Sequence, residues 1–162
     1  MEISIRPARE ADMKDVHRLI RELAEFEREP EAVEVTEDQL REDGFGQNPK
    51  FQCFVAVSGD RIEGMALVYP RYSTWKGPAI HLEDLIVTEA ARGKGVGSAL
   101  LTRVIRHAAD AGVRRVCWEV LDWNEPAIGF YESRGARVLR DWDVVQLDAA
   151  GIAAYLKEYE SI

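Results

Sequence analysis

The chain has 162 residues and carries 21 lysines and arginines against 29 aspartates and glutamates, so its formal charge is −8. This length suffices for one domain with its own core, and we expect a single domain over residues 1–162. The hydrophobic content of 46% excludes a disordered chain, and no apolar run has the length of a membrane span. The acidic balance argues against nucleic-acid binding, and the first residues show no secretory signal. We therefore expect a cytoplasmic protein with no nucleic-acid or membrane partner.

The hydrophobic pattern predicts strands and helices along the whole chain. In chain order they are a strand at 3–6, helices at 11–26 and 36–46, strands at 51–57, 62–69 and 79–87, a helix that starts within 92–98 and ends at 111, a strand at 113–121, a helix at 124–134, strands at 137–142 and 144–147, and a helix at 151–159. No repeat or linker interrupts this order. It is typical of one mixed α/β (α+β) domain built around a sheet.

Residues 92–115 form a basic segment in this acidic chain, with six basic side chains and one acidic side chain. The segment opens with a Gly-rich loop before a predicted helix. The loop consists of Arg92, Gly93, Lys94, Gly95, Val96, Gly97 and Ser98. Glycines let the backbone approach a ligand closely, and the free N–H groups of a helix start attract anions. The loop fits neither the P-loop nor the dinucleotide fingerprint. It predicts another kind of phosphate site, or else a plain turn before a solvent-facing helix.

Two neighbouring carboxylates, Glu83 and Asp84, interrupt the apolar strand predicted at 79–87. A regular strand points neighbouring side chains to opposite faces, and we expect this of the pair. An unpaired carboxylate inside a covered sheet is costly. The sequence therefore predicts either a compensating partner or a face open to solvent.

The cysteines and histidines show no pattern of a metal site. Cys53 and Cys117 lie far apart in apolar, strand-like runs, and we expect both to be small buried hydrophobic residues in a reducing compartment. His17, His81 and His107 lack the spacing of metal ligands, so we expect no metal.

A third motif lies at 122–131, where Asn124 is a natural N-cap and Tyr131 shares a helix face with Ile128. Together the three motifs resemble those of the GNAT superfamily of N-acetyltransferases. RGKGVG matches its R/Q-x-x-G-x-G/A loop, and Asn124, Ala127 and Tyr131 match a second motif. IRPA, RLIRELAEFE, EDGFG, LEDLIV and LDWNEPA resemble the spermidine/spermine N1-acetyltransferase and thialysine N-epsilon-acetyltransferase group. Ser73 stands where the polyamine enzymes carry an acidic residue, so the likeness is closer to the thialysine branch.

The resemblance implies a GNAT fold, in which helices flank a mixed, mostly antiparallel sheet and acetyl-CoA binds at a splayed pair of strands. It implies an N-acetyltransferase that moves an acetyl group from acetyl-CoA to a primary amine of a small cationic molecule by direct attack, through a tetrahedral intermediate. Thialysine, lysine-like amino acids, ornithine, diamines and aminoglycosides all fit that description. Polyamine acetylation, a non-catalytic acyl-CoA-binding sensor and a protein acetyltransferase are the alternatives. Members of the group are commonly homodimers, so a homodimer is implied as well.

The resemblance also implies roles for particular residues. Tyr131 is the general acid, and Glu83 takes the amine proton, directly or through water. Glu27, Trp75 and Asp84 line the amine channel. Acetyl-CoA is bound by Leu85, Ile86, Val87, Arg92, Gly93, Lys94, Gly95, Val96, Gly97, Ser98, Asn124, Ala127 and Tyr131. A lysine-like amine must lose a proton to react, which costs about 4.6 kcal/mol at pH 7.

Overall fold

The computed structural model describes residues 2–161, which fall into two compact units that meet in the sequence between Leu121 and Asp122. The first unit is built around a sheet of five strands in the order β1-β2-β3-β4-β5. The strands are β1 (Ser4–Pro7), β2 (Gln52–Ser58), β3 (Arg61–Ser73), β4 (Gly77–Val87) and β5 (Val116–Cys117). The first four pair antiparallel, and β5 pairs parallel to β4. The expected mixed, mostly antiparallel sheet is confirmed.

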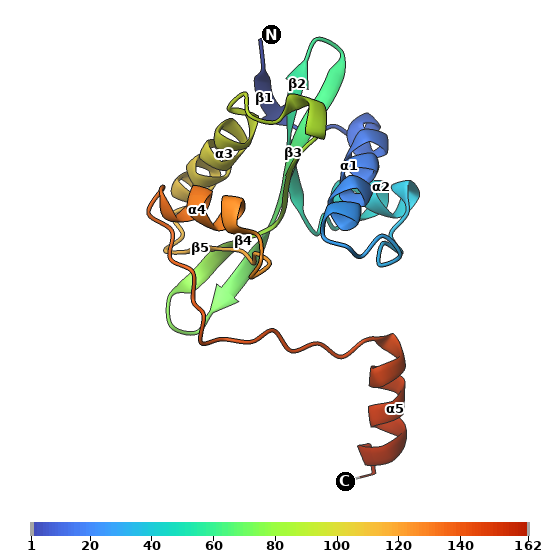
Figure 1. The fold of residues 1–162 in the computed structure, drawn as a ribbon. Coiled ribbons are helices and arrows are strands. Elements are labelled where there is room, and N and C mark those ends of the chain that lie inside the picture. The colour runs from blue at the N-terminus through green and yellow to red at the C-terminus, as the bar shows by residue number, and fades with distance from the viewer. Residues whose placement is uncertain (1, 162) are drawn as a thin grey trace. The chain divides into compact units, whose positions relative to one another are not determined.

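Helices cover both faces of this sheet, with α1 and α2 on one face and α3 on the other (Figure 1). Their bounds are α1 (Met13–Phe26), α2 (Glu37–Phe45) and α3 (Val96–Asp110), with single turns of 3-10 helix at η1 (Glu10–Asp12) and η2 (Glu89–Ala91). The start of α2 follows the expected cap, because the Gln39 backbone N–H donates to Thr36 Oγ1 at 3.1 Å.

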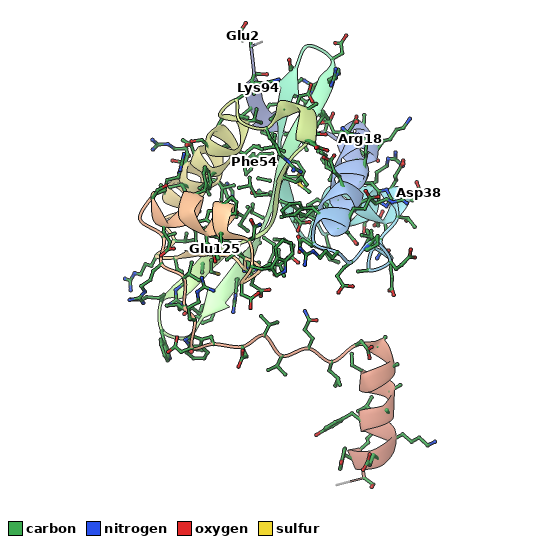
Figure 2. The ribbon with its side chains drawn as sticks, in the orientation of Figure 1. Glu2, Arg18, Asp38, Phe54, Lys94 and Glu125 are labelled. Carbon is green, nitrogen blue, oxygen red and sulfur yellow. The ribbon has the colours of Figure 1, made fainter. Side chains whose placement is uncertain are left out.

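The core lies against both faces of the sheet. On the α1 face, Met13, Val16 and Leu19 pack fully buried in a cluster that includes Leu67 of β3. On the opposite face, Phe54 of β2 meets α3 (Figure 2), where the Arg103 guanidinium lies 4.2 Å from the centre of its ring. The first unit is thus a sheet with a hydrophobic layer on each side.

The second unit contains α4 (Glu125–Glu132) and α5 (Ala149–Tyr159). The strands predicted at 137–142 and 144–147 are wrong, since this segment is extended but pairs with no strand among residues 2–161. Alternating apolar residues give a segment strand propensity, but a strand also needs a neighbour for its backbone groups. For the same reason the strand predicted at 113–121 shrinks to Val116–Cys117, the two residues that pair with β4.

None of the helices within the described residues is long and apolar enough to cross a membrane.

Candidate active site

An irregularity in β4 brings the two neighbouring carboxylates together. Asp84 pairs with Leu67 of β3, but Leu82 pairs with Val68, so Glu83 is an extra residue in the ladder. This is a β-bulge, which interrupts the alternation of side chains. The expectation that Glu83 and Asp84 point to opposite faces is therefore wrong. Asp84 lies opposite Leu67 on the α1 face, and its carboxyl group interacts electrostatically with Glu83.

Glu27, at the C-cap of α1, completes a cluster of three carboxylates with Glu83 and Asp84. Burial raises the pKa of Asp84 to about 7, and the charges of Glu83 and Glu27 add to the shift. Burial and the charge of Glu83 also raise the pKa of Glu27. Within residues 2–161, neither Glu27 nor Asp84 has a side-chain hydrogen-bond donor or a cationic partner. The cluster is a concentration of uncompensated negative charge, which favours a cationic ligand.

The Glu83 carboxylate is held on its other side by two side chains. Tyr69 Oη donates to Glu83 Oε2 at 3.3 Å, and His81 Nε2 lies 3.4 Å from the same oxygen. The Tyr69 and His81 rings lie 5.0 Å apart between their centres, with their planes tilted by 39°. Burial and the nearby Glu83 charge raise the pKa of Tyr69, so this phenol keeps its proton as a donor. Both contacts leave Oε1 of Glu83 for another partner.

The far nitrogen of His81 meets two further groups. Its Nδ1 lies 3.4 Å from Arg71 Nη1 and 3.5 Å from Cys117 Sγ. Cys117 is half-buried and makes polar contacts, so the expectation of a buried hydrophobic residue holds for Cys53 but is wrong for Cys117. Sequence reasoning missed Tyr69, Arg71 and this role of His81. The signal was cross-strand register, because Tyr69 lies directly opposite His81 in the β3–β4 hairpin.

The outer edge of β4 opens beyond His81. β5 pairs only with Ile80 and His81, whereas Leu85 and Ile86 pair with β3 on their inner side alone. Backbone groups of the following residues, up to Val87, therefore face a gap in the ladder where β4 and β5 part. Free N–H groups in such a gap can donate to a ligand carbonyl.

The Gly-rich loop lies at the start of α3. Gly93 and Gly95 have φ values of 75° and 81°, and Gly95 is the N-cap of the helix. These left-handed conformations favour glycine over any residue with a Cβ atom. The first turn of α3 begins at Val96, and the N–H groups at a helix start generally find no acceptor within the helix. This backbone geometry fits the pyrophosphate of a nucleotide cofactor.

The two basic side chains of the loop are tied to backbone carbonyls. Arg92 Nε donates to the Val87 carbonyl at 2.9 Å, and Lys94 Nζ donates to the Ala90 carbonyl at 3.0 Å. Lys94 is labelled beside the start of α3 in Figure 2. Their charges thus add to the field at the helix start while their hydrogen bonds shape the loop.

Asn124, Ala127 and Tyr131 belong to the second unit. Asn124 Oδ1 accepts from the Ala127 backbone N–H at 3.4 Å, which caps α4 as the sequence predicted. Tyr131 lies in the last turn of α4. Burial raises the pKa of its phenol, so the group is protonated at neutral pH.

Trp75 is not brought to the carboxylates within this chain. It lies on the turn between β3 and β4 and is 78% exposed, roughly 20 Å along the strand from Asp84 at about 3.3 Å per residue. The turn is organised by Ser73, whose Oγ accepts from the backbone N–H groups of Trp75 and Lys76 at 3.2 and 3.1 Å. Ser73 also accepts from Arg115 Nη1 at 3.3 Å. It is a turn residue, and no carboxylate stands in its place.

Among the described residues, no group of three His, Cys, Asp or Glu side chains could hold a metal ion.

The sequence also matches known proteins. Residues 13–136 match the acetyltransferase (GNAT) family. The chain is 42% identical over 147 residues to thialysine N-epsilon-acetyltransferase of Sus scrofa, a match that covers 86% of each chain. It is 38% identical to spermidine/spermine N(1)-acetyltransferase-like protein 1 of Homo sapiens over 82% of this chain and 20% of that protein.

Solved structures share the fold. An integron cassette protein from the mobile metagenome of V. cholerae matches with a TM-score of 0.79 and 23% identity, over 97% of this chain and 99% of that one. An aminoglycoside acetyltransferase from a soil metagenome matches with a TM-score of 0.70 and 19% identity, over 89% of this chain and 97% of that one. At these identities the likeness concerns the fold alone.

Proposed function

The chain belongs to the acetyltransferase (GNAT) family, and from that premise we propose that it transfers an acetyl group from acetyl-CoA to a primary amine of a small cationic molecule of the thialysine or lysine type. The family uses acetyl-CoA, and relatives that are 41–42% identical over most of the chain are thialysine N-epsilon-acetyltransferases. The match to the family crosses both compact units, which supports one catalytic domain over residues 1–162.

The observation that carries this proposal is the uncompensated carboxylate cluster of Glu27, Glu83 and Asp84. An ammonium group bound there supplies the missing counter-charge, and its binding draws the Asp84 carboxyl toward its ionised form. The negative charge of the cluster thus favours amines as ligands, and the same charge destabilises the protein when no cation is bound.

Glu83 is the base of the proposed reaction. Tyr69 and His81 hold its Oε2, so Oε1 is the oxygen that takes the amine proton, directly or through one water molecule. Loss of that proton leaves the amine with the lone pair that attacks the acetyl carbonyl. The amine group binds as a cation and leaves as a neutral amide, so it loses a proton during the reaction, and Glu83 is the group that takes it.

Backbone and loop bind the other reactant. Acetyl-CoA, when bound, supplies the activated acetyl thioester. The N–H groups at the open edge of β4, within Leu85, Ile86 and Val87, would donate to the carbonyl oxygen as negative charge develops. The α3 start, with Gly93, Gly95 and the charges of Arg92 and Lys94, would hold the pyrophosphate, together with Val96, Gly97 and Ser98. The family resemblance assigns Asn124 and Ala127 to acetyl-CoA as well.

Tyr131 is the proposed proton donor to the departing thiolate. Its phenol is protonated at neutral pH because burial raises its pKa, as a general acid requires. Glu83 gains one proton from the amine and Tyr131 gives one proton to the thiolate, so protons balance. Exchange with solvent then returns Glu83 to its ionised form and Tyr131 to its protonated form.

We also propose a homodimer in the cytoplasm. The apolar side chains of α5 form one helical face, and Ile152, Tyr155, Leu156 and Tyr159 are 43–56% exposed on it. A second copy of the chain would cover this face. The free thiols of Cys53 and Cys117 support a reducing compartment. Sedimentation of the wild-type chain and of Leu156→Asp tests the dimer, and a concentration-independent monomer in both cases would contradict it.

The function is tested by a turnover screen. Release of free thiol from acetyl-CoA is followed with thialysine, lysine, ornithine, putrescine, spermidine and spermine as acceptors, and mass spectrometry identifies the acetylated product. We expect thialysine or a lysine-like amine to give the highest kcat/KM. Thiol release that no amine accelerates would contradict the proposal.

A further inference from the structure

One cation stands on the acidic face of the sheet without an acidic partner. Arg71 follows Leu67 and Tyr69 at alternate positions of β3, so all three point to the face that α1 covers at Leu67. This is also the face of Asp84, which lies opposite Leu67. Arg71 therefore shares the site with the three carboxylates.

The Arg71 guanidinium is only partly used by the protein. Its Nη1 contacts two groups that are not carboxylates, His81 Nδ1 at 3.4 Å and Cys117 Sγ at 3.6 Å. Among residues 2–161 it forms no ion pair, although Glu83 lies on the far side of the same imidazole. The side chain is exposed, and a guanidinium has five N–H donors in a planar fork that matches a carboxylate. An exposed guanidinium with free donors is a binding site for an anionic group.

The imidazole also fixes the direction of its hydrogen bonds. Arginine can only donate, so His81 Nδ1 accepts from Arg71 and the ring proton is on Nε2. Nε2 lies 3.4 Å from Glu83 Oε2. Arg71, His81 and Glu83 therefore form one chain of contacts, with the cation at one end and the base at the other.

The spacing along this chain matches a particular kind of ligand. One imidazole ring and two contacts of 3.4 Å separate the guanidinium from the base. A lysine molecule with a hydrogen bond of about 2.8 Å at its amine and another at its α-carboxylate can bridge this separation. A molecule with an amine at one end and a carboxylate at the other satisfies both Glu83 and Arg71 at once.

We propose that Arg71 binds the α-carboxylate of the acceptor and so makes the enzyme selective for amino acids with a side-chain amine. Diamines and polyamines of the same length lack the carboxylate and place an ammonium group near the Arg71 cation, which repels it. This inference rests on the proposed acetyl transfer to small amines. It adds the acceptor class and the residue that selects it.

The experiment uses pairs of acceptors that differ only by the carboxylate. Lysine is compared with cadaverine, and ornithine with putrescine, and kcat/KM is measured for each with saturating acetyl-CoA. The variants are Arg71→Met, which removes the charge, and Arg71→Lys, which keeps the charge without the fork. Arg41→Met is the matched control, because the contacts of Arg41 stay on its own helix, with Glu37 and Asp38.

In the wild-type chain we expect the amino acid of each pair to be preferred. Arg71→Met should lower the lysine-to-cadaverine ratio of kcat/KM about 30-fold, which is the loss of one charge-assisted hydrogen-bond pair, and mainly through the KM of lysine. Arg71→Lys should give an intermediate ratio, and Arg41→Met the wild-type ratio.

The outcomes separate this inference from the proposed function. If Arg71→Met lowers kcat/KM for lysine and cadaverine by the same factor, Arg71 is structural and the inference is wrong. A wild-type chain that acetylates cadaverine as well as lysine overturns the inference and leaves the acetyl transfer intact. If the wild-type chain acetylates none of the four acceptors, the proposed function itself fails.

Discussion

The two ends of the candidate site, as proposed, would bind opposite charges by different means. At the start of α3, the anion site is mainly backbone: two glycines with positive φ, the N–H groups of the first helical turn, and basic side chains whose hydrogen bonds go to carbonyls of the loop. In front of β4, the cation site is made of side chains, with Glu27, Glu83 and Asp84 close enough to raise the pKa values of two of them. This difference determines which kind of substitution should disrupt each site. The first depends on chain conformation, and the second on single charged atoms.

Glu83→Gln should produce the largest effect. It keeps the shape of the side chain and removes the base, so kcat/KM for the amine should fall by about 10²–10⁴, with little change in the KM of acetyl-CoA. A pH–rate profile measures this, and its acidic limb should be lost with the base. Glu158→Gln, on the exposed face of α5, is the control. A profile that keeps its shape in Glu83→Gln would show that bulk water or another group accepts the proton.

Tyr131→Phe should have the next largest effect, because it removes the proton donor from the side of the departing thiolate. We expect kcat to fall by about 10²-fold. The basic limb of the profile should also change, since the phenol is the group that ionises there. Steady-state rates from pH 6 to beyond pH 10 test this, with acetyl-CoA and the amine both saturating, because burial raises the pKa of the Tyr131 phenol above its usual 10.0. Full kcat across that range would exclude Tyr131 as the general acid.

Gly95→Val tests the conformational end of the comparison. A β-branched residue is strained at the φ of 81° that starts α3, so the helix start should shift and the KM of acetyl-CoA should rise about tenfold. The KM of the amine should change little. Gly59→Val is a matched control for strain, because Gly59 has a φ of 60° in the β2–β3 turn. If both variants raise the KM of acetyl-CoA equally, the loop has no special part in binding.

Asp84→Asn should give the smallest loss of rate, and it should raise the stability of the fold. The folded chain holds the Asp84 proton up to about pH 7, whereas the usual value is 3.8, so the protonated form stabilises the fold fully below about pH 4. That stabilisation is lost as the pH rises from about 4 to 7. Asparagine cannot ionise, so the variant should melt a few degrees higher than the wild-type chain at pH 8, with a smaller gain at pH 5.

The same substitution should raise the KM of the amine severalfold, because it removes one of the three charges that bind it. Thermal unfolding at pH 5 and pH 8 and amine kinetics at pH 8 measure both effects. Asp60→Asn, on an exposed turn, should show neither. A gain in stability that does not depend on pH would mean that ionisation of Asp84 is not its source.

The sequence predicted those parts of the fold that local chemistry determines. The cap at Thr36, the cap at Asn124 and the Gly-rich start of α3 are where their residue types favour them. The segment at 137–147 has the alternation of a strand, yet it is unpaired, because pairing depends on a neighbour that local pattern does not reveal. Glu83 and Asp84 were singled out because they interrupt an apolar strand, and Glu27 by family resemblance, whereas their mutual effect on pKa required the structure.

The same limit explains the residues that were missed. Tyr69, His81 and Arg71 come from two strands, and only the register of the β3–β4 hairpin brings Tyr69 and His81 to Glu83, and Arg71 to His81. Cys117 lies in an apolar run, which predicts a buried side chain. Its thiol is nevertheless half-buried, because β5 ends at Cys117, where it pairs with His81. Chemistry that is assembled across strands is visible in sequence only after the register is known.

The bulge at Glu83 has a consequence for protein engineering. Since Glu83 is the one residue of β4 that the β3 ladder skips at this point, its deletion would restore regular pairing from Leu82 to Asp84. Substitution leaves the irregular strand in place, whereas deletion removes the irregularity together with the base. A chain shortened by this single codon should fold around an unbroken hairpin. It would be an inactive variant that still carries the Gly-rich loop proposed to bind acetyl-CoA. Such a variant is a starting point for a reagent that captures acyl-CoA.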